Sequence, residues 1–215
     1  MFEMMSTLEL KNVEYAYNKG KNVLNHINAK FESGNVYAIV GASGGGKTTL
    51  LSLIGGLDVP TGGEIMLQEK KINEIGLEDY RRDHVSFIFQ SYNLIDYMTP
   101  IENVNLTSKV DAIPILEHVG LTKEQAKRNV LQLSGGQQQR VAIARALASD
   151  AKILLADEPT GNLDEETAMN IVALLKKSAY EHQKCVIIVT HSPDIAKQAD
   201  VVYSLKKGDL NIIED

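Results

Sequence analysis

The sequence predicts an α/β fold with a mainly parallel sheet, on three observations. Short continuous apolar runs alternate with helical patterns, a glycine-rich loop joins one apolar run to a helix, and another apolar run ends in two carboxylates. Continuous apolar runs are typical of strands covered on both faces, and their alternation with helices is typical of parallel sheets. With 215 residues, of which 44% are hydrophobic and 23% charged, the chain is expected to form one domain with a sizeable core.

Residues 6–40 are expected to be rich in strands. Leu8 and Leu10, and then Val13, Tyr15 and Tyr17, alternate with polar residues as in two half-buried strands. The next expected elements are a polar turn over 18–22, a strand over 23–31, a turn over 32–35 and a buried strand over 36–40. They are followed by a helix over 48–54 that ends at Gly55 and Gly56, and by strand-like patterns over 64–90.

The second half of the chain is expected to alternate between helix and strand. Residues 91–132 are mostly helical or loop in pattern. The expected elements after them are a helix over 135–149, a buried strand over 153–156, an amphipathic helix over 165–181 and a strand over 185–189. Cys185, the single cysteine, lies in the last of these strands and cannot form a disulfide within the chain, so we expect a buried, unreactive thiol.

The composition argues against two classes of protein. A net charge of −6 disfavours a general nucleic-acid binder, whose affinity depends on neutralising phosphates. The longest apolar runs, over 36–40 and 185–189, are far shorter than the roughly 20 residues that a membrane-spanning helix needs. Residues 1–10 carry two glutamates and no basic cluster, which is unlike a signal peptide. We therefore expect a cytoplasmic protein without a nucleic-acid partner.

Residues 41–48 match the pattern G-x-x-x-x-G-K-[ST] between an apolar strand and a helix. Glycines let backbone N–H groups point into one concavity, and the positive end of the helix attracts anions. Lys47 can place its charge on the outer phosphates of a nucleotide, and the Thr48 hydroxyl can ligate Mg²⁺. The segment therefore predicts a site for a nucleoside triphosphate.

A second chemical signal is the apolar strand over 153–156, which is followed by Asp157 and Glu158. Open α/β sheets bind ligands at the carboxyl ends of their strands. Asp157 is therefore expected to help hold Mg²⁺, while Glu158 points elsewhere and can polarise an attacking water. Together with the phosphate-binding segment, the two carboxylates predict hydrolysis of the triphosphate.

Residues 133–140 read Leu-Ser-Gly-Gly-Gln-Gln-Gln-Arg and precede that strand. Ser134 is suited to cap the following helix, whose N-terminus favours an anion. The segment resembles the signature sequence of ABC proteins. With residues 57–62 and 157–164, it is most similar to the subgroup of macrolide exporters, lipoprotein-release ATPases, the cell-division ATPase and antimicrobial-peptide transporters. The resemblance covers nearly the whole chain.

The resemblance implies a P-loop NTPase fold of the ABC ATPase type with mainly parallel sheet. Its single domain would comprise an N-terminal antiparallel β portion and core over 1–90, a helical lobe over about 91–134 and further core over 135–215. The interval from Gln90 to Ser134 is shorter than usual for the subgroup, so we expect a reduced lobe, much of which would lie between Thr107 and Leu121. Loss of part of the lobe would change the surface that receives the coupling helix of a membrane subunit. Residues 129–132 also lack the proline often found before the signature.

The resemblance also implies roles for individual residues. The catalytic residues would be Glu158, His191, Lys47 and Gln90. ATP would be bound by Tyr17, stacked on the adenine, and by Gly41, Ala42, Ser43, Gly44, Gly45, Gly46, Lys47, Thr48 and Thr49. A second subunit would contribute Ser134, Gly135, Gly136, Gln137 and Asp164 to the same ATP. The Mg²⁺ ligands would be Thr48, Gln90 and Asp157.

The function implied is that of the ATP-hydrolysing subunit of an ABC transporter. Two copies, expected as a homodimer, would bind two ATP and two Mg²⁺ head to tail beneath separate membrane permease subunits, on the inner face of the cell membrane. The subgroup favours export of a peptide, lipid or drug-like substrate, and the alternative is a regulatory ATPase of the cell-division type. A soluble ABC ATPase acting on DNA or ribosomes is disfavoured because the chain has no coiled-coil insertion or second cassette, and residues 133–140 disfavour a P-loop kinase or GTPase.

Overall fold

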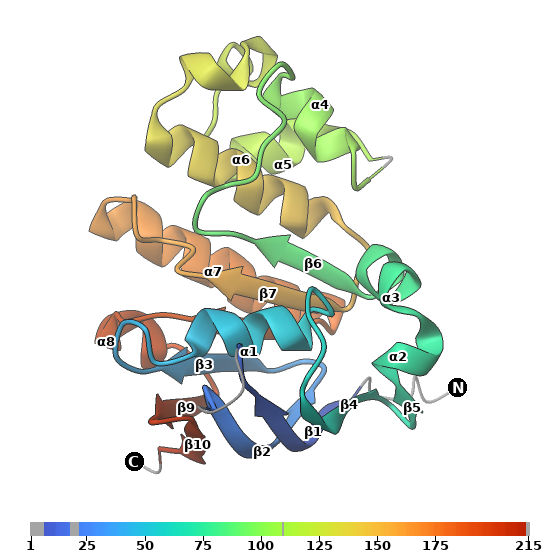
Figure 1. The fold of residues 1–215 in the computed structure, drawn as a ribbon. Coiled ribbons are helices and arrows are strands. Elements are labelled where there is room, and N and C mark those ends of the chain that lie inside the picture. The colour runs from blue at the N-terminus through green and yellow to red at the C-terminus, as the bar shows by residue number, and fades with distance from the viewer. Residues whose placement is uncertain (1–6, 18–21, 109, 214–215) are drawn as a thin grey trace.

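The computed structural model describes residues 7–17, 22–108 and 110–213 (Figure 1). It contains two sheets and a group of short helices. The antiparallel sheet lies at the bottom of Figure 1, most of the six-stranded sheet in the middle, and the helices of residues 100–132 at the top. Among the described residues, no helix is both long and apolar enough to span a lipid bilayer.

The antiparallel sheet has the strand order β2-β1-β4-β5. Its strands are β1 (Thr7–Tyr15), β2 (Leu24–Glu32), β4 (Gly62–Leu67) and β5 (Lys70–Lys71). The two alternating stretches predicted around Leu8 and Val13 form one strand, because a bulge between Leu10 and Val13 shifts the register and restores the apolar side chains to the same face. Tyr17 lies beyond the end of β1, and the turn predicted over 18–22 falls largely outside the described residues.

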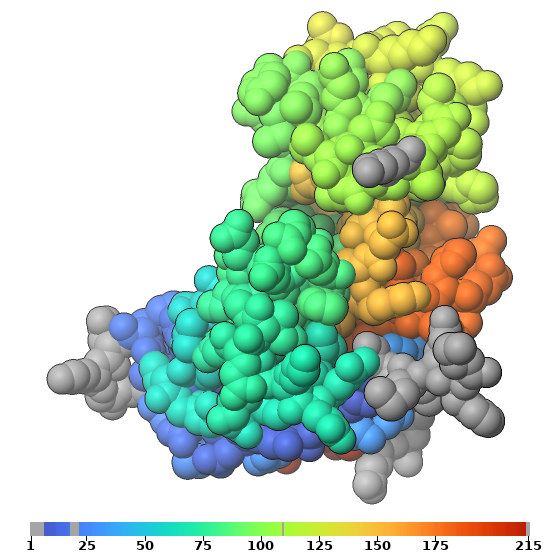
Figure 2. All heavy atoms as spheres, turned by 90° about the vertical axis from the view of Figure 1, so that its right-hand side faces the viewer, coloured from blue at the N-terminus to red at the C-terminus, as the bar shows by residue number. Residues whose placement is uncertain are grey.

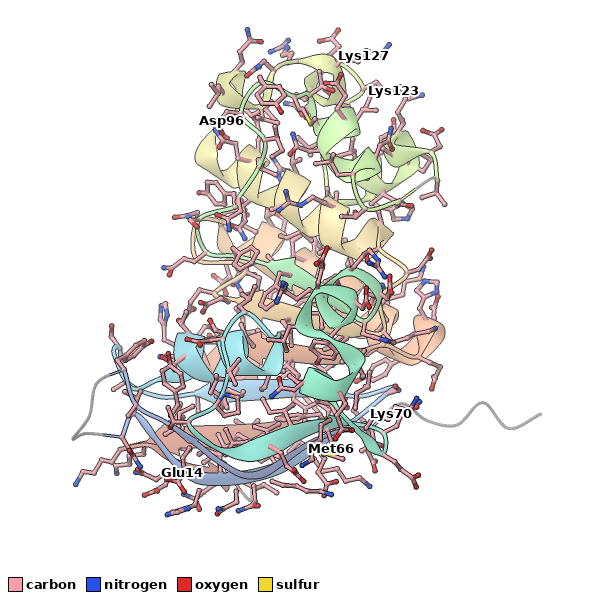
Figure 3. All side chains as sticks on the ribbon, turned by 45° about the vertical axis from the view of Figure 1, so that its right-hand side comes forward. Glu14, Met66, Lys70, Asp96, Lys123 and Lys127 are labelled. Atoms are coloured by element: carbon pink, nitrogen blue, oxygen red, sulfur yellow. The ribbon has the colours of Figure 1, made fainter. Side chains whose placement is uncertain are left out.

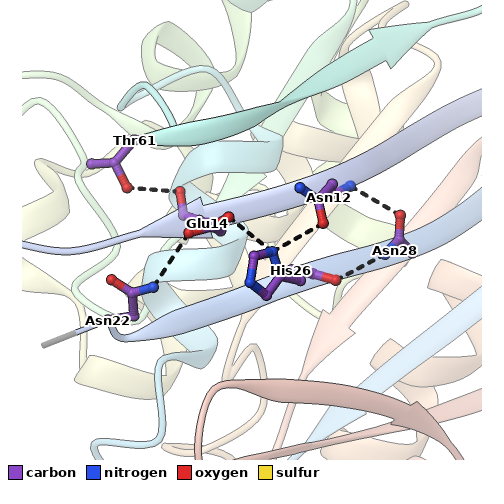
Figure 4. A network of polar contacts seen from close by, with 6 residues as sticks. All are labelled: Asn12, Glu14, Asn22, His26, Asn28 and Thr61. Carbon is purple, nitrogen blue, oxygen red and sulfur yellow. Dashed lines mark hydrogen bonds and ion pairs between the residues drawn. The ribbon is translucent and has the colours of Figure 1, made fainter.

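Polar side chains hold the irregular part of this strand pair together (Figure 4). Asn12 and His26 have φ values of 54° and 45°, a conformation that few non-glycine residues adopt. The backbone N–H of Asn12 donates to Asn28 Oδ1 at 2.9 Å, and His26 Nδ1 lies 2.8 Å from Glu14 Oε1. Glu14 also accepts from Asn22 and, through its backbone carbonyl, from Thr61. The network therefore satisfies polar groups that the bulge removes from the regular ladder.

The six-stranded sheet has the order β10-β9-β3-β8-β7-β6, and all its pairs are parallel except β10 with β9. Its strands are β3 (Val36–Val40), β6 (Val85–Ile88), β7 (Ile153–Asp157), β8 (Cys185–Val189), β9 (Val201–Lys206) and β10 (Asp209–Ile212). Side chains of β8 alternate between two hydrophobic clusters, one on each face of the sheet. This arrangement explains the continuous apolar runs and confirms the mainly parallel sheet. Cys185 is buried, and burial raises the pKa of its thiol to about 12, which leaves it unreactive.

Helices cover both faces of this sheet. One face packs on α1 (Lys47–Ile54) and the antiparallel sheet, and the other on α6 (Gly135–Ala148) and α7 (Glu165–His182). Beyond α6 lie α4 (Pro100–Asn105), α5 (Ala112–His118) and two 3₁₀ turns, Gln125–Lys127 and Val130–Gln132. They form the upper part of the molecule in Figure 2. Figure 3 labels Asp96, Lys123 and Lys127 in this upper part, and Glu14, Met66 and Lys70 in the antiparallel sheet.

The strand pattern predicted over 64–90 is wrong for its middle section. Residues 72–83 form two short helices, α2 (Ile72–Ile75) and α3 (Leu77–Asp83). Their apolar residues recur at a helical spacing that places Ile72 and Tyr80 in the core, and the Tyr80 hydroxyl donates to the backbone carbonyl of Ile54 at 2.8 Å. The short helix α8 (Pro193–Ala196) completes the fold.

Candidate functional site

The ends of three neighbouring strands assemble the candidate site. In the sheet, β3 pairs with β8 and β8 with β7, all parallel, so their carboxyl ends lie along one edge. Residues 41–46 follow β3, Asp157 ends β7, and His191 follows β8. The fold therefore brings together the glycine-rich segment, the paired carboxylates and the histidine that the sequence singled out.

Residues 41–46 form a turn that leads into the N-terminus of α1. Gly44 and Gly46 have φ values of 71° and 93°, which only glycine adopts readily. Gly46 is the N-cap of α1 and provides no side-chain acceptor for the first amides of the helix. The helix start therefore keeps backbone donors available for an anionic ligand.

Lys47 lies folded over this turn. Its ammonium group donates to the carbonyl oxygens of Gly41 at 2.9 Å and Ala42 at 3.0 Å, and the residue is only 8% exposed. No carboxylate forms an ion pair with it among the ion pairs of the described residues. A buried cation with only neutral acceptors favours an anionic partner. The segment therefore fits the phosphates of a nucleotide.

Replacing Gly41 by alanine is expected to disrupt this turn, because the new Cβ would collide with the backbone carbonyl oxygen of Leu205 in β9. Crowding of this kind costs about 1–3 kcal/mol, so we expect the melting temperature of a chain of this length to fall by about 2–12 °C. The check is thermal unfolding beside a Gly161→Ala control, whose Cβ would lie 3.7 Å from its nearest neighbour, the Glu158 carbonyl oxygen. Equal melting temperatures for both variants would contradict the packing described.

The side chains of Asp157 and Thr48 interact with each other. Asp157 is 7% exposed, and burial raises the pKa of its carboxyl, although the interaction with Thr48 and the charge of Lys47 oppose this. A cation bound to the carboxylate would offset that cost of burial. A carboxylate and a hydroxyl are oxygen ligands that fit Mg²⁺, which keeps water and phosphate oxygens as its remaining ligands.

Glu158 and His191 form the second polar pair of the site. His191 Nδ1 lies 2.8 Å from Glu158 Oε1, and the side chains are 74% and 14% exposed, respectively. Glu158 has a φ of 48°, and its backbone N–H donates to the Val189 carbonyl at 2.9 Å. Few non-glycine residues adopt this φ, so the backbone conformation changes at Glu158, directly after β7 ends. A cavity of about 300 Å³ opens beside the pair.

Gln90 and the two tyrosines differ in how the structure places them. Gln90 is exposed in a turn two residues beyond β6, so it does not end the strand as predicted, but β6 pairs with β7 and leaves it beside the same sheet edge. Tyr17 is 65% exposed, and its hydroxyl lies 2.7 Å from Thr49 Oγ1 in α1. Tyr15 is buried and hydrogen-bonded to Asp58. Tyr17 is therefore the tyrosine whose ring is available near the turn.

The residues predicted to contact ATP from a second subunit lie elsewhere in the chain. Ser134 caps α6: it accepts from the Gln137 backbone N–H at 3.3 Å, and the Gln137 side chain accepts from the Ser134 N–H at 2.9 Å. Asp164 caps α7 by accepting from the Thr167 N–H at 2.9 Å, and this hydrogen bond lowers the pKa of its carboxyl. Among the described residues no hydrogen bond joins these caps to residues 41–49, so the two groups of predicted ATP contacts, the two predicted half-sites, are separate within one chain.

Three residues without a signal in the sequence link the loop after β6 to α6 and to the segment after Glu158. Arg145 in α6 donates to the backbone carbonyls of Tyr92 and Asn93, and the Tyr92 hydroxyl accepts from Asn162. No local motif signals these contacts, because the partners are 53 and 70 residues apart along the chain. The sequence gives one indirect indication: Tyr92 lies close after Gln90, which is a predicted site residue.

The chain is similar to proteins of one known family. The family described as "ABC transporter" matches residues 24–161. The chain is 45% identical to the ABC transporter ATP-binding protein YclH of Bacillus subtilis, with 98% of each chain covered. It is 40% identical to the lipoprotein-releasing system ATP-binding protein LolD of Rickettsia felis, covering 96% of this chain and 98% of LolD.

Solved structures of an ABC transporter cassette are also similar to this chain. The dimeric structure of MJ0796, an ABC transporter cassette of Methanocaldococcus jannaschii, is similar with a TM-score of 0.88 and 38% identity, over 97% of this chain and 99% of that one. A dimeric post-hydrolysis state of the same cassette, bound to ADP and Pi, is similar with a TM-score of 0.87, 37% identity and the same coverage. These likenesses confirm the fold predicted from the sequence.

Proposed function

The chain belongs to the ABC transporter family, and we propose that it is the ATP-binding and ATP-hydrolysing subunit of such a transporter, acting through separate membrane subunits. The observation that carries the proposal is the placement of the glycine-rich turn, Asp157 and the Glu158–His191 pair along one sheet edge. The lipoprotein-releasing relative supports export as the direction of transport. The regulatory alternative has no support from the relatives.

We infer that residues 41–48 bind the phosphates of ATP and that the ring of Tyr17 stacks on the adenine. The turn and the start of α1 offer backbone N–H donors, and Lys47 offers a charge that no carboxylate already neutralises. Asp157 and Thr48 would hold Mg²⁺, with Gln90 nearby at the same edge. Mg²⁺, when bound, supplies positive charge to the phosphate oxygens.

Hydrolysis then depends on the Glu158–His191 pair. A water molecule attacks the γ-phosphorus and the bond to the β–γ bridging oxygen breaks, which yields ADP and phosphate. Glu158 orients this water and accepts its proton, while His191, held by Glu158 at 2.8 Å, and Lys47 stabilise the charge that develops on the γ-phosphate. The dimeric post-hydrolysis state of the MJ0796 cassette supports this reaction for the family.

A second copy of the chain would complete each ATP site. The caps at Ser134 and Asp164 lie apart from the glycine-rich turn of their own chain, and the similar cassettes form dimers. We propose that each ATP is held between residues 41–48 of one copy and residues 134–137 of the other. The positive ends of two helices would then meet the same phosphates, so that dimerisation depends on ATP.

Replacing Ser134 by arginine is expected to abolish the ATP-dependent dimer without weakening ATP binding to the monomer. The bulky side chain would fill the surface that meets the other copy's nucleotide, while residues 41–48 remain unchanged. Size-exclusion chromatography with Mg²⁺ and ATP, in a Glu158→Gln background that slows hydrolysis, would measure the effect. Asn211→Arg, on exposed β10, is the control. A dimer that persists in the Ser134→Arg variant would exclude the contact.

The membrane partner is best tested in cells. We propose that the subunit is bound at the inner face of the cell membrane by permease subunits. Purification of the tagged chain from solubilised membranes should recover a membrane-spanning protein in stoichiometric amount. Recovery of the chain from the soluble fraction alone would contradict its role in transport.

A further inference from the structure

Tyr92 occupies a constrained position between α6 and the segment that follows Glu158. It follows Gln90 in the loop after β6, and both Tyr92 and Asn93 have positive φ values, 63° and 49°. Arg145 in α6 fixes this loop, because its guanidinium donates to the Tyr92 carbonyl at 3.0 Å and to the Asn93 carbonyl at 2.7 Å. The backbone of Tyr92 is thus held on α6 and its side chain is aimed by an unusual backbone conformation.

The hydroxyl of Tyr92 contacts the segment that follows Glu158. Asn162 Nδ2 donates to it at 2.8 Å. A Cβ at Gly135 would lie 3.2 Å from the same hydroxyl, and a Cβ at Gly136 would lie 3.2 Å from the Asn162 carbonyl oxygen. The two glycines at the start of α6 therefore admit the close approach of Tyr92 and Asn162 of their own chain.

We propose that the Tyr92 hydroxyl is a positioning group that holds residues 161–164 against the start of α6 and so sets the surface offered to the second copy's ATP. This inference rests on the proposed function. Tyr92 joins three elements: the loop of Gln90, the segment from Glu158 to Asp164, and the helix capped by Ser134. The hydrogen bond is exposed to solvent, so it adds little to overall stability and its effect is local.

The Tyr92→Phe variant removes only the hydroxyl. In the Glu158→Gln background we expect the dissociation constant of the ATP-dependent dimer to rise about three- to ten-fold, the effect of losing one hydrogen bond. ATP affinity of the monomer should stay the same, because residues 41–48 are untouched. Tyr97→Phe is the matched control, since Tyr97 is 79% exposed in the same connection. An unchanged dimer dissociation constant in Tyr92→Phe overturns the proposal.

Asn162, which donates to the Tyr92 hydroxyl in the same chain, allows an independent test. Asn162→Ala should weaken the dimer to the same degree, and the double variant should be no weaker than either single one, since both remove one interaction. Effects that simply add would show two unrelated roles and overturn the proposal. Sedimentation equilibrium with Mg²⁺ and ATP can measure all four proteins.

Hydrogen exchange separates this inference from the proposed function. In the nucleotide-free subunit, the amides of residues 161–164 should exchange about three- to ten-fold faster in Tyr92→Phe and Asn162→Ala than in the Tyr97→Phe control. Unchanged exchange overturns the positioning role. Failure of the Glu158→Gln protein itself to dimerise with ATP would instead contradict the proposed function.

Discussion

Replacement of Glu158 by glutamine is expected to lower kcat for ATP hydrolysis by at least about 100-fold, the usual contribution of a positioned general base. The amide keeps the shape of the side chain but cannot accept the proton of the attacking water. ATP affinity should remain close to that of the native chain, because Glu158 is not part of the turn over 41–48. The variant should therefore accumulate the ATP-bound state.

The measurement is phosphate release under saturating ATP and Mg²⁺, with nucleotide binding followed separately by fluorescence. Glu166→Gln is a matched control, because Glu166 is exposed in the first turn of α7, a short way along the chain from Glu158. The control should hydrolyse ATP at the native rate. Near-native hydrolysis by Glu158→Gln would remove Glu158 from its catalytic role.

Replacement of Lys47 by alanine is expected to weaken ATP binding about 100-fold. Lys47 is the buried cation of the turn, and each charge-assisted hydrogen bond that it makes to a phosphate contributes about 1.5–3 kcal/mol. ADP binding should weaken less than ATP binding, since the outermost phosphate contributes to the loss only with ATP. Isothermal titration calorimetry with both nucleotides would measure the difference.

Two controls separate this effect from misfolding. Lys197→Ala removes an exposed lysine that follows α8 and forms a long ion pair with Asp194, and it should leave ATP affinity unchanged. The melting temperature of Lys47→Ala without nucleotide reports whether loss of the two carbonyl contacts loosens the turn. An ATP dissociation constant equal to the native value would count against phosphate binding by residues 41–48.

The parts of the fold that were predictable are those with a local signal. The continuous apolar runs of β3, β7 and β8 are strands buried on both faces, and the glycine-rich turn precedes a helix as its sequence requires. The failure over 72–83 has a physical cause: short helices of four and seven residues carry too few apolar positions to distinguish a helical period from a strand. The bulge at Asn12 likewise has no signal beyond a shift in alternation.

The residues of the candidate site likewise divide into those with a local signal in the sequence and those placed by tertiary packing. The turn, Asp157 and Glu158 are encoded by neighbouring residues and strand ends, so their convergence could be anticipated. The choice between Tyr15 and Tyr17 depends on where the bulged strand ends, which places Tyr15 in the core and Tyr17 beside Thr49. The contacts of Tyr92 with Arg145 and Asn162 depend on tertiary packing alone and could not be predicted.

The proposed function requires each ATP to be shared between two copies of the chain. A crystal or cryo-EM structure of the Glu158→Gln protein with Mg²⁺ and ATP would show whether it is shared. We predict a two-fold dimer in which each triphosphate contacts residues 41–48 of one copy and Ser134 of the other. Nucleotide bound away from residues 41–48, or bound there with no contact from the second copy, would contradict it.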